Sequence, residues 1–181
     1  ETPLPTRYSL DYIRTIGLGR KIGANGLMLQ GIRQKSTPPE QWKDTVKTLK
    51  RSMLALSLPH DIRQFASHSP DLYAIYQKLS DFGCFREDRL FIPYWEKNQT
   101  LKVNNENVLL SYYQRSDALL IILSNYFNAE AVDVEISSTL LRKIPLRDYE
   151  SGKEADAKKI VIPGYDFRLL FMTIDTKISP L

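Results

Sequence analysis

The sequence predicts an α+β protein in which an N-terminal helical segment, residues 1–85, packs on a C-terminal antiparallel β-sandwich, residues 86–181. Two observations lead to this prediction. Up to about residue 85 the apolar residues recur with the helical period of about 3.6, and after residue 89 they recur with the strand period of about two. About seven or eight short strands, separated by turns every 8–12 residues or so, are typical of a sandwich.

The composition is that of a globular protein, with 43% hydrophobic and 25% charged residues among 181. No apolar run approaches the roughly 20 residues that a membrane-spanning helix needs. The net charge of +4 comes from basic residues spread along the chain, so we expect no nucleic-acid partner. A single cysteine, Cys84, excludes an intramolecular disulfide, and we expect it to be a small buried hydrophobe. With only two histidines, no metal site is expected. We expect no cofactor either.

The first elements are short. Residues 8–16 have the apolar spacing of an amphipathic helix that Ser9 can cap. Four glycines follow at spacings that do not match a phosphate-binding loop. The apolar run at 27–29 can form a buried strand. The chain begins at Glu1 without a signal peptide, and we expect it to be a mature or excised segment of something longer.

Two longer helices come next. The first begins near Pro38 and is ended by Pro59. Its apolar residues lie at spacings of three and four and form one continuous face: Trp42, Val46, Leu49, Met53 and Leu56. The second helix begins at Pro70, behind a Ser69 cap, and Gly83 provides its C-terminal cap. Such one-sided helices must pack on each other, on the sheet, or on a part of the parent protein outside this chain.

The strands are organised around one hairpin. Residues 108–113 and 118–123, joined by a polar turn, have the character of strands buried on both faces. The strand at 90–95 contains Pro93, which predicts an edge or bulged strand. Shorter strands are expected at 100–103, 131–136, 143–148, 159–162 and 166–174.

Several short motifs carry a resemblance. The runs SYYQRSDALLIILSN at 111–125 and IVIPGYDFRLL at 160–170 resemble strands of the α-amylase-like C-terminal domain. GANGLML at 23–29 is similar to a late strand of a (β/α)8 barrel, and the helix at 38–58 with the LPHD motif at its end resembles the closing segment of that barrel. FIPYW at 91–95 resembles the element that begins the sandwich of large bacterial glycoside hydrolases.

The resemblance implies that the chain is the C-terminal part of such a glycoside hydrolase: the end of the catalytic barrel plus an accessory β-sandwich. A whole barrel takes roughly 250 residues, more than this chain holds. The resemblance further implies carbohydrate as the substrate of the parent enzyme, an upstream catalytic domain as partner, and an extracellular or periplasmic location. A stand-alone carbohydrate-binding sandwich and a small enzyme stay open as alternatives.

His60 and Asp61 are the candidate catalytic residues. A histidine beside an acid in the loop after a helix can contact a substrate. The alternative is a histidine that binds free carbonyl groups at the helix terminus. Glycoside hydrolysis needs two carboxylates flanking one bond, and the spacing of the acidic residues pairs no two of them.

Tyr94, Trp95 and Tyr113 are candidate carbohydrate-binding residues, because an aromatic ring can lie under the apolar face of a pyranose. Tyr94 and Trp95 are adjacent, so on a strand their side chains would face opposite sides. Packing between the two parts of the chain is the alternative role for these rings.

Overall fold

The chain folds into a mixed structure of a few helices and a mostly antiparallel, sheet-rich part. The structure is a computed structural model. It describes residues 9–17, 27–28, 42–64, 70–86, 89–97, 99–138 and 145–174.

The helices and one parallel strand pair come first in the chain. In order they are α1 (Leu10–Gly17), β1 (Leu27–Met28), α2 (Trp42–Ser57), the 3-10 turn η4 (Leu58–His60), β2 (Arg63–Gln64) and α3 (Pro70–Phe82). β1 and β2 pair in parallel, with Leu27 opposite Arg63. Parallel neighbours need a crossover connection, and α2 lies in that connection.

The later strands are antiparallel. They are β3 (Leu90–Ile92), β4 (Lys102–Val103), β5 (Leu109–Gln114), β6 (Ala118–Asn125), β7 (Val132–Val134), β8 (Ile136–Ser137), β9 (Leu146–Asp148), β10 (Glu154–Ala155), β11 (Ile160–Ile162) and β12 (Asp166–Thr173). Six of them form one sheet in the order β10-β9-β12-β6-β5-β3, while β11 pairs with β7 and β4 pairs with β8.

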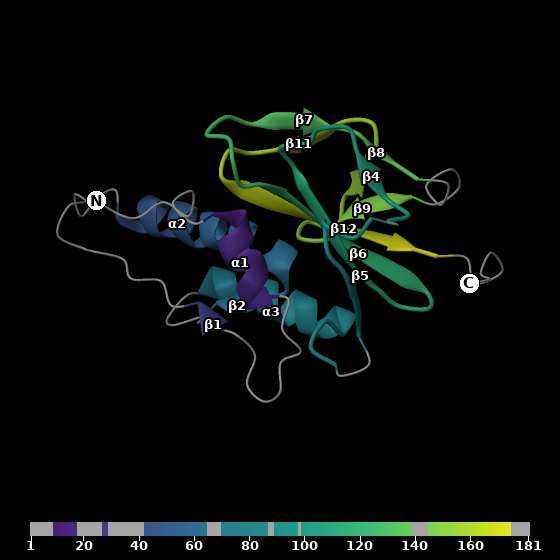
Figure 1. The fold of residues 1–181 in the computed structure, drawn as a ribbon, viewed down its shortest axis with the longest axis horizontal. Helices are drawn as coiled ribbons and strands as arrows, with labels where there is room; N and C mark the ends of the chain where they lie inside the picture. Colours follow the sequence, from purple (N-terminus) through teal and green to yellow (C-terminus); the bar gives the residue numbers. More distant parts are fainter. Residues whose placement is uncertain are drawn as a thin grey trace.

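The six-stranded sheet is covered on both faces. On one face Leu120 and Ile122 of β6 join a core with α2 and α3. On the other face Leu119 and Ile121 join a core with the two strand pairs. Figure 1 shows the helices and these strand pairs on different sides of β5, β6 and β12. The mixed class is therefore confirmed, but a sandwich of two complete sheets is not, because the sheets are open.

The central hairpin is the most accurate of the predictions. β5 pairs along its whole length with residues 119–124 of β6, from Leu109 opposite Ser124 to Gln114 opposite Leu119. Every residue of β6 is buried, as is every residue of β5 except Gln114. Burial on both faces follows from the layers above and below the sheet, and it explains why apolar residues run without a break from Ala118 to Leu123.

Two of the predicted strands are interrupted. The strand at 90–95 ends at Ile92, and Pro93 begins a turn closed by a 3.0 Å bond from the Glu96 N–H to the Pro93 carbonyl. Its place at the edge of the sheet is confirmed. Proline lacks the N–H that a strand in the middle of a sheet would donate. The strand at 131–136 is divided at Glu135 into β7 and β8, which pair with different partners.

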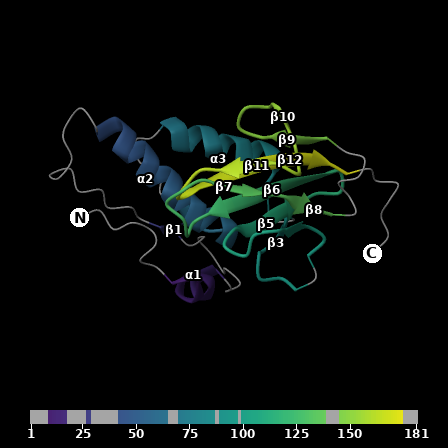
Figure 2. The same cartoon turned by 90° about the horizontal axis from the view of Figure 1, so that it is seen from above.

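The long helix differs from a one-sided amphipathic helix. Leu49, Met53 and Leu56 are buried as predicted, but so is every residue from Ser52 to His60. The reason is that this end of the helix lies between the sheet and α1: Leu54 packs toward the sheet, while Leu56 packs with Ile13 of α1. In Figure 2, α1 lies at the bottom of the view and α3 near the top, and α2 runs from the upper left toward α1. The predicted start at Pro38 and the side chains of Trp42 and Val46 lie outside the described residues.

The end of α3 is as predicted. Gly83 has a φ of +96°, and the N–H groups of Gly83 and Cys84 donate to the carbonyls of Ser80 and Leu79. This is the Schellman motif, in which glycine adopts the left-handed conformation without strain. Cys84 is 1% exposed, so its prediction as a buried hydrophobe is confirmed. The predicted cap Ser69 lies outside the described residues.

Core residues from both sides of position 85 pack together. Leu54 and Leu79, from the helices, share one cluster with Leu120 and Phe167 of the sheet. The division of the chain into two domains near residue 85 stays a prediction.

Candidate functional site

The five predicted site residues lie together where η4 meets β5 and the turn after β3. His60 contacts Tyr94 and Trp95, and Asp61 binds Tyr113. The His60–Tyr94 and Asp61–Tyr113 contacts join residues that are 34 and 52 positions apart in the sequence. The five residues therefore come together through the fold and not through the local sequence.

His60 has both ring nitrogens occupied. Its Nδ1–H donates to the Leu56 carbonyl at 2.6 Å, and the Tyr94 hydroxyl donates to Nε2 at 3.2 Å. The carbonyl can only accept, so the neutral ring carries its proton on Nδ1. The side chain is 1% exposed. This is the helix-terminus contact that the sequence left open as the alternative, and the catalytic role of His60 stays a prediction.

Burial lowers the pKa of His60 to about 4, with the Arg14 guanidinium contributing and the bond to Leu56 opposing. In the unfolded chain His60 binds a proton near pH 6.5. Its contribution to the free energy of unfolding is therefore fully present above that pH and is lost as the pH falls toward 4. We expect the free energy of unfolding to drop by about 2 kcal/mol between pH 7 and pH 5. Urea unfolding at the two pH values measures this drop.

The matched variant is His60→Gln, which keeps a donor for the Leu56 carbonyl but cannot titrate. Its free energy of unfolding is expected to change much less between pH 7 and pH 5. An equal drop in the variant would show that other groups, not His60, carry the pH dependence.

Ser111 joins three segments beneath this site. Its hydroxyl donates to the Pro59 carbonyl and accepts the Tyr94 N–H, both at 2.9 Å, and the residue is fully buried. It therefore fixes η4 and the turn after β3 onto β5. Sequence reasoning missed Ser111, although a lone hydroxyl in an apolar strand is a signal for a buried hydrogen bond.

Asp61 is held from two directions. Its Oδ1 accepts the Tyr113 hydroxyl and its Oδ2 accepts an Arg89 N–H, each at 2.7 Å. The backbone of Asp61 is left-handed, with a φ of 54°, a conformation that aspartate tolerates better than most residues. Burial, and then the Asp61 carboxylate, raise the pKa of Tyr113 well above its ordinary value. Asp61 therefore orients a buried phenol and a half-buried guanidinium.

The three candidate sugar-binding rings pack against protein groups. Tyr94 and Trp95 lie in a turn, not on a strand, so the expectation of opposite faces is wrong: their rings meet edge to face at 4.8 Å. Both rings contact His60, and the Arg14 guanidinium lies 5.2 Å from the Trp95 ring centre. Tyr113 is 4% exposed. Their role in carbohydrate binding stays a prediction.

A second polar cluster ties α2 to the sheet. Arg51 donates to both oxygens of Glu150, at 2.9 and 3.0 Å, and to Asp166 at 2.7 Å. Its guanidinium lies 4.4 Å from the Phe167 ring centre. Burial raises the pKa of the Asp166 carboxyl more than Arg51 lowers it. The partners are 99 and 115 residues away from Arg51, so no local pattern could have predicted this cluster.

Within the described part of the chain, no group of three or more His, Cys, Asp or Glu side chains is placed to hold a metal ion. None of the helices described is both long and apolar enough to cross a membrane.

Comparisons with known proteins give structural neighbours only. No protein-family profile and no curated protein match the chain. It is similar to a noncanonic maltogenic alpha-amylase from Thermotoga neapolitana, at a TM-score of 0.50 and 10% identity over 96% of this chain and 47% of that chain. A GH42 beta-galactosidase from G. stearothermophilus gives a TM-score of 0.32 and 17% identity over 57% of this chain and 12% of that chain.

Both neighbours are glycoside hydrolases, and this chain spans less than half the length of either. The likeness to the amylase shows a common fold and nothing further about activity.

Proposed function

We propose that this chain is the C-terminal part of a glycoside hydrolase, in which the last strand–helix units of a catalytic barrel are held by an accessory β-domain. The observation that carries the proposal is the parallel pair β1–β2 with α2 in its crossover, followed by α3 and then by an antiparallel sheet. Strand, helix, parallel strand, helix is the repeating unit of a (β/α)8 barrel.

The parallel pair is too small to stand as a sheet. β1 and β2 have two residues each, and a stable sheet needs three or more strands with an apolar face. Upstream strands of a barrel would supply the missing neighbours. The fold shared with the alpha-amylase over 96% of this chain supports this proposal, since that enzyme is about twice as long.

The β-domain would support the barrel by holding the end of α2. The Ser124 hydroxyl donates to the Ala55 carbonyl at 2.6 Å, and Ser111 binds Pro59. Arg51 adds the ionic contacts to Glu150 and Asp166. In this role the sheet is not catalytic. Its contribution is to fix the position of the last barrel helices, while carbohydrate binds through the parent enzyme, outside the cell or in the periplasm.

The test compares the natural gene product with the 181-residue chain. Each is screened for release of reducing ends from oligosaccharides with α and β linkages. We expect the gene product to contain a barrel-sized region before this chain and to hydrolyse at least one substrate, and the chain alone to hydrolyse none. A gene product with no such region, or with one and no hydrolysis of any substrate, would overturn the proposal.

The stand-alone carbohydrate-binding module is less well supported by the geometry. It requires an exposed aromatic platform, whereas Tyr113 is buried and Tyr94 and Trp95 pack on His60. Glycan-array binding by the 181-residue chain that is lost in Trp95→Ala would favour the module instead.

A further inference from the structure

The order of the elements fixes the end of the parallel pair to which α2 returns. η4 and then β2 follow directly after α2, so the last turn of α2 lies at the end where β2 begins. Because β1 and β2 are parallel, β1 begins at the same end, which we call the N-terminal end of the pair. The 16 residues of α2 span about 24 Å, so the helix starts far from this end.

The end of α3 lies at the same N-terminal end. Phe85 follows α3, and its ring centre lies 4.1 Å from the Cζ of Arg63, the first residue of β2. Arg89, further along the same segment, donates to Asp61 at 2.7 Å, and Asp61 lies between η4 and β2. Both helices therefore bring their C-terminal ends to the place where β2 begins.

One face of β5 binds both helix ends there. Ser111, Tyr113 and Arg115 lie two residues apart along β5 and into the turn after it, and side chains at this spacing on a strand point to the same face. They donate hydrogen bonds to the turn after α2 and to the end of α3: Ser111 to the Pro59 carbonyl at 2.9 Å, Tyr113 to the Asp61 carboxylate at 2.7 Å, and Arg115 to the Phe82 carbonyl at 3.3 Å. The last carbonyl groups of a helix lack partners within it, and a cationic donor there also interacts favourably with the helix dipole.

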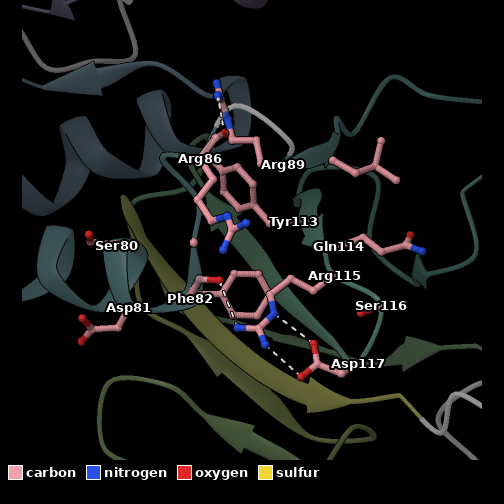
Figure 3. Close-up of a pocket in the computed structure, with 12 residues that line it drawn as sticks. Ser80, Asp81, Phe82, Arg86, Arg89, Tyr113, Gln114, Arg115, Ser116 and Asp117 are labelled. Atoms are coloured by element: carbon pink, nitrogen blue, oxygen red, sulfur yellow. Dashed lines mark hydrogen bonds and ion pairs between the residues drawn. The ribbon is translucent and has the colours of Figure 1, made fainter.

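A pocket of about 790 Å³ opens beside this end of α3. Its volume is within the range of small-molecule sites, roughly 300–1,000 Å³, so its size alone would make it a candidate active site. Phe82, Arg86 and Arg115 are among its lining residues. Figure 3 shows Arg115 bound to Phe82 and to Asp117 in this pocket. The pocket and the cluster around His60 therefore lie at the N-terminal end of the parallel pair.

Catalysis in a (β/α)8 barrel takes place at the other end. The active site of such an enzyme is built from the loops that follow the strands, at their C-terminal ends, whereas the N-terminal end serves stability. In the proposed function β1 and β2 are two of these strands. Every hydrogen bond described above between β5 and the helices is then made at the end of the barrel that does not carry the chemistry.

We propose that the β-domain is attached to the barrel of the parent enzyme at the N-terminal end of the strands, and that the active site opens at the opposite end, where β1 and β2 terminate. This inference rests on the proposed function. Asp61 and Arg115 then hold the ends of α2 and α3, and neither the cluster around His60 nor the pocket beside Arg115 binds the substrate.

Hydrogen–deuterium exchange of the natural gene product locates the bound substrate. Exchange is compared with and without a saturating concentration of the oligosaccharide that the gene product hydrolyses in the screen above. Peptides that begin at Leu27 and at Arg63 and run past the ends of β1 and β2 are expected to be protected by the oligosaccharide. Peptides that cover 58–62, 80–86 and 111–117 are expected to exchange at an unchanged rate.

Arg115→Gln in the gene product is the second measurement. It is expected to change kcat and KM by less than about twofold, because Arg115 holds α3 and does not touch the substrate. If the pocket were the active site, loss of this guanidinium would lower kcat/KM by about tenfold or more. Arg147→Gln is the matched control, since Arg147 is an exposed arginine on β9 outside the pocket lining. Thermal unfolding checks that both variants are folded.

Protection of the peptides at the N-terminal end, protection at neither end, or a loss of kcat/KM of that size in Arg115→Gln would each overturn this placement of the active site. These outcomes leave the hydrolysis itself intact, and with it the proposed function. A gene product that hydrolyses none of the oligosaccharides fails already in the screen and overturns both.

Discussion

Phe167→Ala is expected to lower the free energy of unfolding by about 3–5 kcal/mol, the usual cost of removing a fully buried aromatic ring. Phe167 is 0% exposed and lies in the core between the sheet and the helices, with the Arg51 guanidinium over its ring. The variant loses packing between α2 and β12. It also removes the ring on which the Arg51 guanidinium lies. Urea unfolding followed by far-UV circular dichroism and by tryptophan fluorescence measures the change.

Phe127→Ala is the control, because Phe127 is the same residue type but 43% exposed. It should cost no more than about 1 kcal/mol, as surface substitutions do. The two spectroscopic signals should also fall together, since residues before and after position 85 share the core that contains Phe167. Separate transitions would show instead that the helical segment and the sheet unfold as independent units.

Local patterns were sufficient for elements whose neighbours in sequence are also their neighbours in space. The β5–β6 hairpin, the end of α3 at Gly83 and the edge position of β3 could each be predicted from a few consecutive residues. Each of these depends on a local rule: burial on both faces, a left-handed cap, or a proline that cannot donate.

The same patterns could not predict which elements pack together. The burial of α2 on several sides at its end depends on α1 and on the sheet, and neither is visible in the period of the helix itself. The parallel pairing of β1 with β2 and the division of the second half into one open sheet and two strand pairs are likewise long-range properties. The sandwich was predicted from the number and spacing of the strands. These contain no information on which strands pair, so they could not show that the sheets are open.

The candidate site shows the same limit. His60 and Asp61 were singled out as a pair, yet they point to different partners: His60 to Tyr94 and Leu56, Asp61 to Tyr113 and Arg89. Sequence adjacency suggested a shared function, whereas the left-handed backbone at Asp61 turns the two side chains toward different contacts. The pocket lined by Arg86 was not predicted, because it forms only where the loop after α3 meets the hairpin turn.

Asp61→Ala is expected to lower the free energy of unfolding by about 3 kcal/mol, through three losses that occur together. The buried Tyr113 hydroxyl loses its acceptor, the Arg89 guanidinium loses its 2.7 Å partner, and an alanine must take a φ near 54°. Asp61→Asn should cost about 1 kcal/mol, because asparagine tolerates the left-handed region and can still accept from Tyr113. Urea unfolding at pH 7 compares the variants.

Asp117→Ala separates this effect from the loss of any aspartate–arginine pair. Asp117 binds Arg115 at 2.8 Å, but the two side chains are 54% and 47% exposed, and exposed pairs contribute about 1 kcal/mol or less. If Asp61→Ala costs no more than Asp117→Ala, Asp61 does not hold Tyr113 and Arg89 in place. If Asp61→Ala costs about 3 kcal/mol while Asp61→Asn costs far less, the shape and hydrogen bonding of the side chain matter more than its charge. That result is expected of a residue that positions others.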